Sequence, residues 1–290
     1  MQRNEGIGRD RQADGESATD ANWPTALLLM ACFVLAQADK QVMGLLAIPV
    51  QQAFSLSDTQ LGFLQGGAFA IAFAIGGLPI AHMLDNGHRI RIAAACVAAW
   101  SLATILCGLA SSFALLLLFR AATAFAEAGL PPAAFSIFSQ SKRAAIAARL
   151  TGTFMLAPFI GGGGMLLLGG LLLQLAGQGS LDFLGGFEGW RLVFILVGLP
   201  GLALALALAI WGHEPPRPKA APIEAPTGAS KIASYRDVAS AIFVRNPFLR
   251  FYYLGLTCFY LFAASLIGWY PALLSRELAL QPSSAGGFAG

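Results

Sequence analysis

Long apolar runs separated by short polar segments dominate the chain. Each run approaches 20 residues, whereas a membrane-spanning strand would alternate apolar and polar positions over about ten residues. As a helix rising 1.5 Å per residue, a run of this length crosses a hydrocarbon core of roughly 30 Å. The pattern therefore predicts an all-α membrane protein with seven transmembrane helices, at residues 25–47, 61–84, 90–110, 113–138, 148–176, 190–211 and 248–274.

Composition supports a membrane protein and excludes several other classes. Apolar residues make up 57% of the 290 residues and charged residues only 11%, whereas soluble domains have roughly 25% charged residues. So few charges cannot cover a soluble particle, which excludes a cytosolic enzyme, a nucleic-acid binder and a disordered chain. The sequence also has no hydrolase, metalloprotease or phosphate-loop motif. We therefore expect no enzymatic activity, no metal site, no cofactor and no nucleic-acid partner.

Basic residues predict the orientation of the helices. Lys and Arg gather in the N-terminal tail and in the segments after the second, fourth and sixth apolar runs, while the opposite loops have almost none. Because cytoplasmic loops carry the excess of Lys and Arg, we expect a multi-pass membrane protein with its N-terminus in the cytoplasm. The expected location is a bacterial inner membrane.

Polar sequence divides the chain into four parts. Residues 1–22 form a cytoplasmic tail and residues 23–212 a six-helix bundle. Residues 213–247 are rich in Pro and Ala with scattered charge, which is typical of a linker. Residues 248–290 contain the seventh helix and the start of a further Gly-rich segment. An odd number of helices after a long linker suggests a truncated chain whose C-terminal half is missing.

Three charges lie inside the predicted spans. A charge at the bilayer centre costs roughly 2.5–3.5 kcal/mol on the insertion scale, so such residues are rare without a function. Asp39 lies ~21 Å along the first helix, and Arg120 on the antiparallel fourth helix lies at about the same depth. Glu127 follows Arg120 by seven residues, so it returns to the same face ~10 Å lower. The spacing predicts one buried cluster of two acids and one base.

Two interpretations of this cluster remain open. The three residues could be an ion-paired group that only holds two helices together, or a titratable site in a water-accessible cavity. Two acids for one base favour the second interpretation. So do Pro131 and Pro132, because proline removes a backbone hydrogen bond and frees carbonyls inside the membrane.

Other polar and aromatic residues form the expected surroundings of the site. Pro158, with the glycines that follow it, is a further candidate hinge beside Pro131 and Pro132. Lys40 lies on a different face from Asp39, and we expect it to reach toward the outer interface. The histidines His82 and His88 are expected to be solvated near the cytoplasmic surface. The candidate cavity-lining residues are Gln37, Gln41, Tyr253 and Tyr260.

Several motifs resemble one known family. The segment AHMLDNGHRIR at 81–91 resembles the inner-loop signature of the major facilitator superfamily, with Asp85, Arg89 and Arg91 as its charged positions, while Ala81 and Asn86 replace a glycine and an arginine. More specific segments resemble the spinster-like branch of that superfamily. They are ADKQV at 38–42, LSDTQLGFLQG at 56–66, WSLATILCGLASSF at 100–113, FRAATAFAEAGLPPAAFS at 119–136 and GWR at 189–191.

The resemblance implies a secondary transporter. Such proteins have two six-helix halves that alternate access around a central site, usually driven by protons. Asp39 and Glu127 would be the proton-coupling acids, and Arg120 their charge partner or a ligand for an anionic substrate. The expected partners are the lipid bilayer, protons and a small-molecule substrate, either amphipathic and lipid-like or an organic anion. The alternative is a non-transporting truncated membrane protein or interaction fragment.

Overall fold

A computed structural model describes residues 23–141, 143–177, 188–215 and 240–277. The predicted tail at 1–22, most of the predicted linker and residues 278–290 lie outside the described residues. Within them, seven helical stretches are long and apolar enough to cross a membrane, which confirms the predicted number of spans. They are Trp23–Leu45, Asp58–Asn86, Arg89–Gly108, Phe113–Phe138, Ala144–Leu175, Gly189–Trp211 and Pro247–Leu266.

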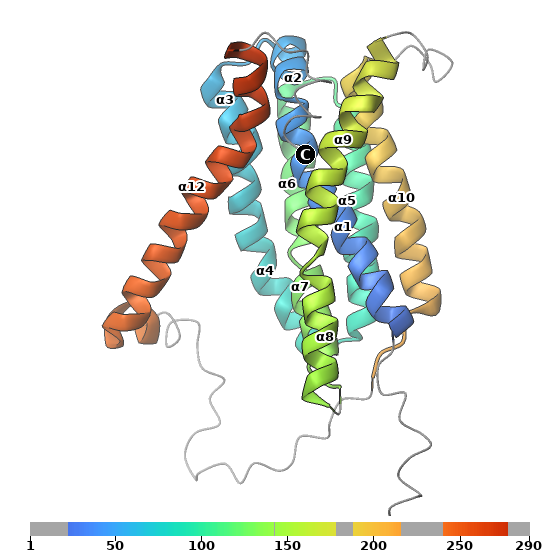
Figure 1. Ribbon diagram of the computed structural model, residues 1–290, viewed down its shortest axis with the longest axis vertical. Coiled ribbons are helices and arrows are strands. Elements are labelled where there is room, and N and C mark those ends of the chain that lie inside the picture. Colours follow the sequence, from blue (N-terminus) through green and yellow to red (C-terminus); the bar gives the residue numbers. More distant parts are fainter. Residues whose placement is uncertain (1–22, 142, 178–187, 216–239, 278–290) are drawn as a thin grey trace, which may run out of the picture.

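The helices stand side by side as an elongated bundle (Figure 1). Short breaks divide several spans into separate elements. In chain order the elements are α1 (Trp23–Leu45), α2 (Ala47–Phe54), α3 (Asp58–Gly62), the π-helical turn η2 (Phe63–Gly67), α4 (Ala68–Asn86), α5 (Arg89–Gly108), α6 (Phe113–Glu127), α7 (Leu130–Phe138), α8 (Ala144–Phe154), α9 (Ala157–Gly177), α10 (Gly189–Trp211), the π-helical turn η4 (Ala241–Arg245) and α12 (Pro247–Glu277).

Prolines mark the breaks in the fourth and fifth spans. The fourth span divides directly after Glu127, and Pro131 and Pro132 fall in the first turn of α7. The fifth span divides between α8 and α9, and Pro158 falls in the first turn of α9. A proline is tolerated in a first turn because its missing N–H has no partner there in any case. Their action as hinges stays a prediction.

The second span begins earlier than its apolar run. Ser57 and Gln60 form a reciprocal cap, in which Ser57 Oγ accepts from the Gln60 backbone at 3.2 Å and Gln60 Oε1 accepts from the Ser57 backbone at 2.9 Å. This capping box starts α3 at Asp58, three residues before the predicted start at 61. The π-helical turn η2 then joins α3 to α4 without a break.

Close helix packing forms two apolar clusters. One lies toward the α4–α5 turn, around Trp100, Phe138 and Phe154, and the other lies toward the α5–α6 turn, around Leu64 and Phe194. The helix α1 runs through the bundle in contact with α8, α9, α10 and α12. Glycines allow the closest approaches, since a Cβ on Gly161 of α9 would clash with the Val34 carbonyl of α1.

The seventh span packs on one side of the bundle. Figure 1 shows α12 close to the bundle near its end and diverging from it toward its start. Trp269 is partly buried against the cluster at the α5–α6 end and lies close to Gly62. Tyr253 and Tyr260 are exposed. The turn η4 lies inside the predicted linker at 213–247, so the last part of that segment is helical.

Candidate functional site

The structure brings Asp39 and Arg120 together in the interior of the bundle. Both residues are 1% exposed. Arg120 Nη1 donates to Asp39 Oδ2 at 2.5 Å, and Nη2 donates to the Asp39 backbone carbonyl at 3.2 Å. Thr104 of α5 donates from Oγ1 to the second carboxylate oxygen at 2.8 Å. Asp39 is therefore fixed by a cation and a hydroxyl from two other helices.

Glu127 pairs with Lys40 rather than with Arg120. Lys40 Nζ lies 3.4 Å from Glu127 Oε2, and the two side chains are 31% and 1% exposed respectively. The expectation that Lys40 extends toward the outer interface is therefore wrong. Its four-carbon stem is long and flexible enough to bring the ammonium to an acid on α6. The site thus contains two acids and two bases.

Two aromatic rings of α4 cover the cations. The Phe69 ring centroid lies 5.1 Å from the Arg120 guanidinium carbon and 5.8 Å from Lys40 Nζ. The Phe73 centroid lies 5.3 Å from Lys40 Nζ. These distances allow cation–π attraction. Both rings lie at i, i+4 positions on α4, a regular helical spacing.

The two ion pairs differ in how well their polar atoms are satisfied. Both Asp39 carboxylate oxygens accept hydrogen bonds, whereas neither oxygen of Glu127 accepts one from the described residues. A buried charge is expensive unless it is paired and hydrogen-bonded. Glu127 therefore has less to lose on becoming neutral than Asp39 has. The geometry favours Glu127 as the acid that can change its protonation state.

The predicted cavity-lining residues lie at different places. Gln37 and Gln41 of α1 pack against the glycine run of α9, with Gln41 Nε2 3.4 Å from the position of a Cβ on Gly162. Tyr253 and Tyr260 lie on the exposed surface of α12. A cavity-lining role for these four residues stays a prediction. Sequence reasoning missed Thr104, Phe69 and Phe73, because an isolated Thr or Phe in an apolar helix carries no signal of its own.

A second polar cluster surrounds Arg89 at the α4–α5 end. The side chain is 1% exposed, and its Nε donates to Glu214 Oε1 at 2.8 Å. Its terminal nitrogens donate to Ser136 near the end of α7, to Gln140 just after that helix and to the Pro215 carbonyl. Arg89 therefore ties the start of α5 to the fourth span and to the segment after α10. Sequence reasoning missed Glu214, which stands 125 residues away.

His88 also contacts this cluster, so the expectation that it is only solvated is wrong. Its Nδ1 lies 2.6 Å from Glu214 Oε2. Partial burial of Glu214 raises its pKa, because burial disfavours the charged form. The hydrogen bonds and positive charge of Arg89 act in the opposite direction, together with the Ile90 N–H and His88. Their combined effect is larger, so the pKa of Glu214 is lowered. The other inner-loop residues are exposed, Asp85 in the last turn of α4 and Arg91 in the first turn of α5.

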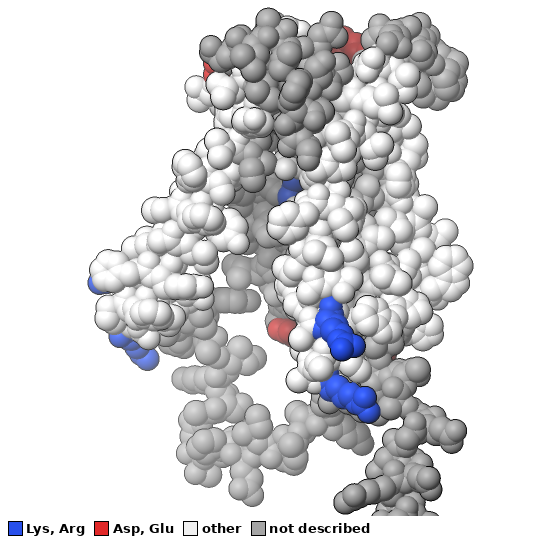
Figure 2. Space-filling view, in the orientation of Figure 1, with Lys and Arg blue, Asp and Glu red and all other residues white. Residues whose placement is uncertain are grey.

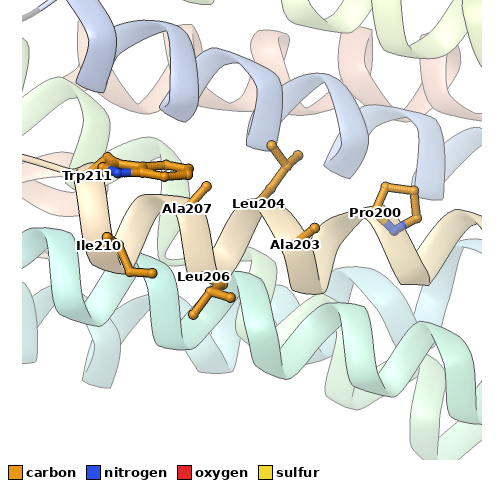
Figure 3. Close-up of a pocket in the computed structure, with 7 residues that line it drawn as sticks. All are labelled: Pro200, Ala203, Leu204, Leu206, Ala207, Ile210 and Trp211. Carbon is orange, nitrogen blue, oxygen red and sulfur yellow. The ribbon is translucent and has the colours of Figure 1, made fainter.

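An apolar groove on the outside of the bundle is unrelated to the charged site. Figure 3 shows its lining side chains along α10, among them Pro200, Leu206 and Trp211. None of the charged residues described above lines this groove. Its lining is almost entirely apolar, which suits contact with acyl chains. Figure 2 shows that charged side chains are similarly sparse on the visible flanks of the molecule.

Comparison with known proteins gives one family and several relatives. The sequence pattern of the Major Facilitator Superfamily matches residues 28–290. An MFS-type efflux pump of Mycolicibacterium smegmatis is 32% identical over 203 residues, which cover 68% of this chain and 44% of the pump. A quinolone resistance transporter of Acinetobacter baumannii is 25% identical over 63% of this chain and 41% of its own length. The chain thus spans less than half the length of these curated relatives.

Solved structures give the same picture of the fold. The crystal structure of a bacterial homologue of the human lysosomal transporter Spinster, inward-facing and unoccupied, has a TM-score of 0.77 and 33% identity. The match covers 93% of this chain and 58% of that one. A D-xylose-proton symporter has a TM-score of 0.67 at 16% identity, over 92% of this chain and 64% of its own. At that identity the second match shows the fold alone.

Proposed function

We propose a proton-coupled transport function for this chain, which belongs to the major facilitator superfamily of membrane transporters. The α4–α5 end would lie in the cytoplasm of a bacterial inner membrane, with the N-terminus on the same side. Figure 2 supports this orientation, since the basic side chains visible there gather mainly at the end where α8 and α12 begin. Such an excess of Lys and Arg is typical of cytoplasmic loops.

In the proposed coupling, ionised Glu127 and the anionic substrate compete for Lys40. When Glu127 is ionised it pairs with Lys40, and when it takes up a proton Lys40 loses its anionic partner. An unpaired ammonium inside the membrane is costly, so the protonated site attracts an anion. One proton and one anionic group would then occupy the site together. The observation that carries this proposal is the 3.4 Å pair between partly exposed Lys40 and buried Glu127.

Lys40 is a better substrate ligand than Arg120 in this arrangement. Arg120 is buried, and two of its nitrogens are engaged by Asp39. Removing Arg120 from that pair would leave a buried aspartate without its cation, which is strongly unfavourable. We therefore assign Arg120 the role of fixed charge partner, and Asp39 the task of holding Arg120 in place.

The proposed substrate is an amphipathic anion, lipid-like or a small organic acid. Its anionic group would bind Lys40, and its apolar part would contact aromatic side chains such as Phe69 and Phe73. Of the efflux pump, the quinolone resistance transporter and the Spinster homologue, the quinolone resistance transporter alone is named after a class of compounds.

A binding experiment on the chain itself tests the coupling. The 290-residue chain in lipid nanodiscs is titrated with undecanoate between pH 6 and pH 9, with empty nanodiscs as the control for partitioning. We expect binding to strengthen as the pH falls, with one proton taken up per anion, measured calorimetrically in buffers of different ionisation enthalpy. Lys40→Met should weaken binding about tenfold or more, the range for a charged hydrogen bond. Binding that is independent of pH and of Lys40 would refute the proposal.

The second candidate function is that of a truncated membrane protein that does not transport. The chain spans 44% of the length of the efflux pump and 58% of the length of the Spinster homologue. Expression from the complete reading frame, followed by assay of acid-driven uptake of undecanoate into proteoliposomes, separates the two candidates. Uptake that requires Lys40 supports the transporter.

A further inference from the structure

The π-helical turn η2 holds a buried amide that has no partner in the described part of the chain. Neither Nε2 nor Oε1 of Gln65 makes a hydrogen bond, and both atoms are buried. An amide within a membrane span is expected to be hydrogen-bonded, because hydrocarbon offers it no alternative. Single π-helical turns within helices are frequent at functional sites. The unpaired amide therefore points to a ligand.

Position connects this amide with the charged site. Gln65 precedes Phe69 by four residues and Phe73 by eight, so the three side chains follow one face of the second span. The Phe69 ring contacts both Lys40 and Arg120. Gln65 therefore lies about one helical turn, ~5 Å, beyond the charged site toward the α5–α6 end.

The surroundings place η2 where the seventh span meets the bundle. Trp269 of α12 lies 3.2 Å from the position of a Cβ on Gly62, at the start of the π-helical turn. Leu61 and Leu64, on either side of Gly62, belong to the buried cluster against which Trp269 packs. A group bound at Gln65 would thus be held between the bundle and α12.

We infer that Gln65 binds a neutral hydrogen-bonding group of the substrate, an amide or a hydroxyl, located next to its anionic end. This inference rests on the proposed function, in which the anionic end binds Lys40. A carboxamide offers two donors and one acceptor, so it can pair with the N–H and the C=O of a substrate amide at once. A plain fatty acid would leave Gln65 unpaired. The site therefore selects N-acyl amino acids and similar amphipathic anions over simple fatty acids.

Two probes of equal chain length test this selectivity. N-octanoylglycine carries an amide beside its carboxylate, and undecanoate has the same number of chain atoms without the amide. Both are titrated into the 290-residue chain in nanodiscs at pH 6, and into Gln65→Met, which conserves volume but removes the amide. Gln52→Met is the matched control, because Gln52 lies exposed at the end of α2.

We expect the unchanged chain and Gln52→Met to bind N-octanoylglycine about tenfold more tightly than undecanoate, since a site built to pair a polar group discriminates against its absence. Gln65→Met should bind both probes equally and keep its melting temperature, because the Gln65 amide makes no hydrogen bond to any described residue. A preference that survives in Gln65→Met, or a large fall in melting temperature with loss of both probes, overturns the inference.

The same titrations distinguish the two proposals. If both probes bind through Lys40 but Gln65→Met leaves their ratio unchanged, the subsite is refuted and the proposed function stands. If neither probe binds the unchanged chain, or if Lys40→Met has no effect on either, the proposed function fails and the subsite fails with it.

Discussion

Individual residues in the charged site have unequal freedom to change state. Asp39 is held by Arg120 and Thr104, whereas Glu127 has one ionic partner and no hydrogen bond within the described residues. Neutralising Asp39 would leave the buried guanidinium of Arg120 without its anion. Neutralising Glu127 would free the ammonium of Lys40, which is already partly exposed. In the proposed function, Asp39 would therefore be a fixed charge and Glu127 the acid that takes up and releases a proton.

Glu127→Gln should abolish proton-driven transport while leaving substrate binding and exchange measurable. The amide is neutral at every pH, so Lys40 stays available to the anion but no proton accompanies it. The measurement is uptake into proteoliposomes with and without an acid gradient, using the complete reading frame, and counterflow exchange is the control. An undiminished response to the gradient would move the coupling role to Asp39.

Arg120→Ala should damage both stability and transport. Removing one partner of a buried ion pair costs about 3–5 kcal/mol, because the other charge is left unpaired. Thermal unfolding in detergent measures the loss. The double variant Asp39→Asn with Arg120→Met should recover most of the stability, because neither charge is then left without its partner. Stability that falls further in the double variant would show that the pair is not the source of the effect.

At the scale of whole helices, glycines allow the closest contacts between neighbouring helices. Gly161 lets α9 lie against the α1 backbone at Val34, whereas a Cβ at Gly164 would meet nothing within 4 Å. The same glycine run thus has one position that sets the distance between two helices and one that does not. This contrast favours tight packing as the role of Gly161.

Gly161→Ala should therefore destabilise the bundle, by roughly 1–3 kcal/mol as for other overpacked sites. Gly164→Ala is the control in the same helix, and it should be neutral or stabilising by up to about 1 kcal/mol, because alanine is the better helix former. Melting temperatures of the two variants in the same detergent check the prediction. Equal effects would mean that α1 and α9 separate freely.

For the whole molecule, the cluster around Arg89 joins the first and last parts of the six-helix bundle. Arg89 at the start of α5 contacts the fourth span and the segment after α10. The backbone N–H of His213 also donates to Thr25 of α1 at 2.9 Å. These hydrogen bonds join the first, third, fourth and sixth spans at one end of the bundle. They add directional contacts to the apolar packing there.

Acid should weaken this junction. The pKa of Glu214 is lowered in the folded chain, so its stabilisation is fully present above the ordinary value of about 4.3. This stabilisation is lost as the pH falls through the lower pKa that Glu214 has in the folded chain. Glu214→Gln should remove about 1–3 kcal/mol near neutral pH, and the difference from the unchanged chain should shrink below about pH 4. Melting temperatures between pH 3 and pH 8 test this, with Glu188→Gln as the control. A constant difference would contradict the assignment.

The amino-acid sequence by itself determined the seven spans and the three buried charges. Both follow from local properties: a helix must be apolar over the hydrocarbon thickness, and each charge within it is costly wherever its neighbours lie. The spacing of Arg120 and Glu127 on one helix also follows directly from helical geometry. The prolines named as candidate hinges lie just after the breaks in the fourth and fifth spans, although the sequence pattern predicts both spans as single helices.

Only the tertiary structure decided which charges meet. Lys40 pairs with Glu127 because the rotation of α1 and the reach of a flexible side chain bring them together, and helical periodicity fixes neither. Arg89 and Glu214 meet across 125 positions because α10 returns to the end of the bundle where α5 begins. Partner choice depends on helix rotation, tilt and side-chain rotamer. These are set by packing of the whole bundle rather than by any one segment.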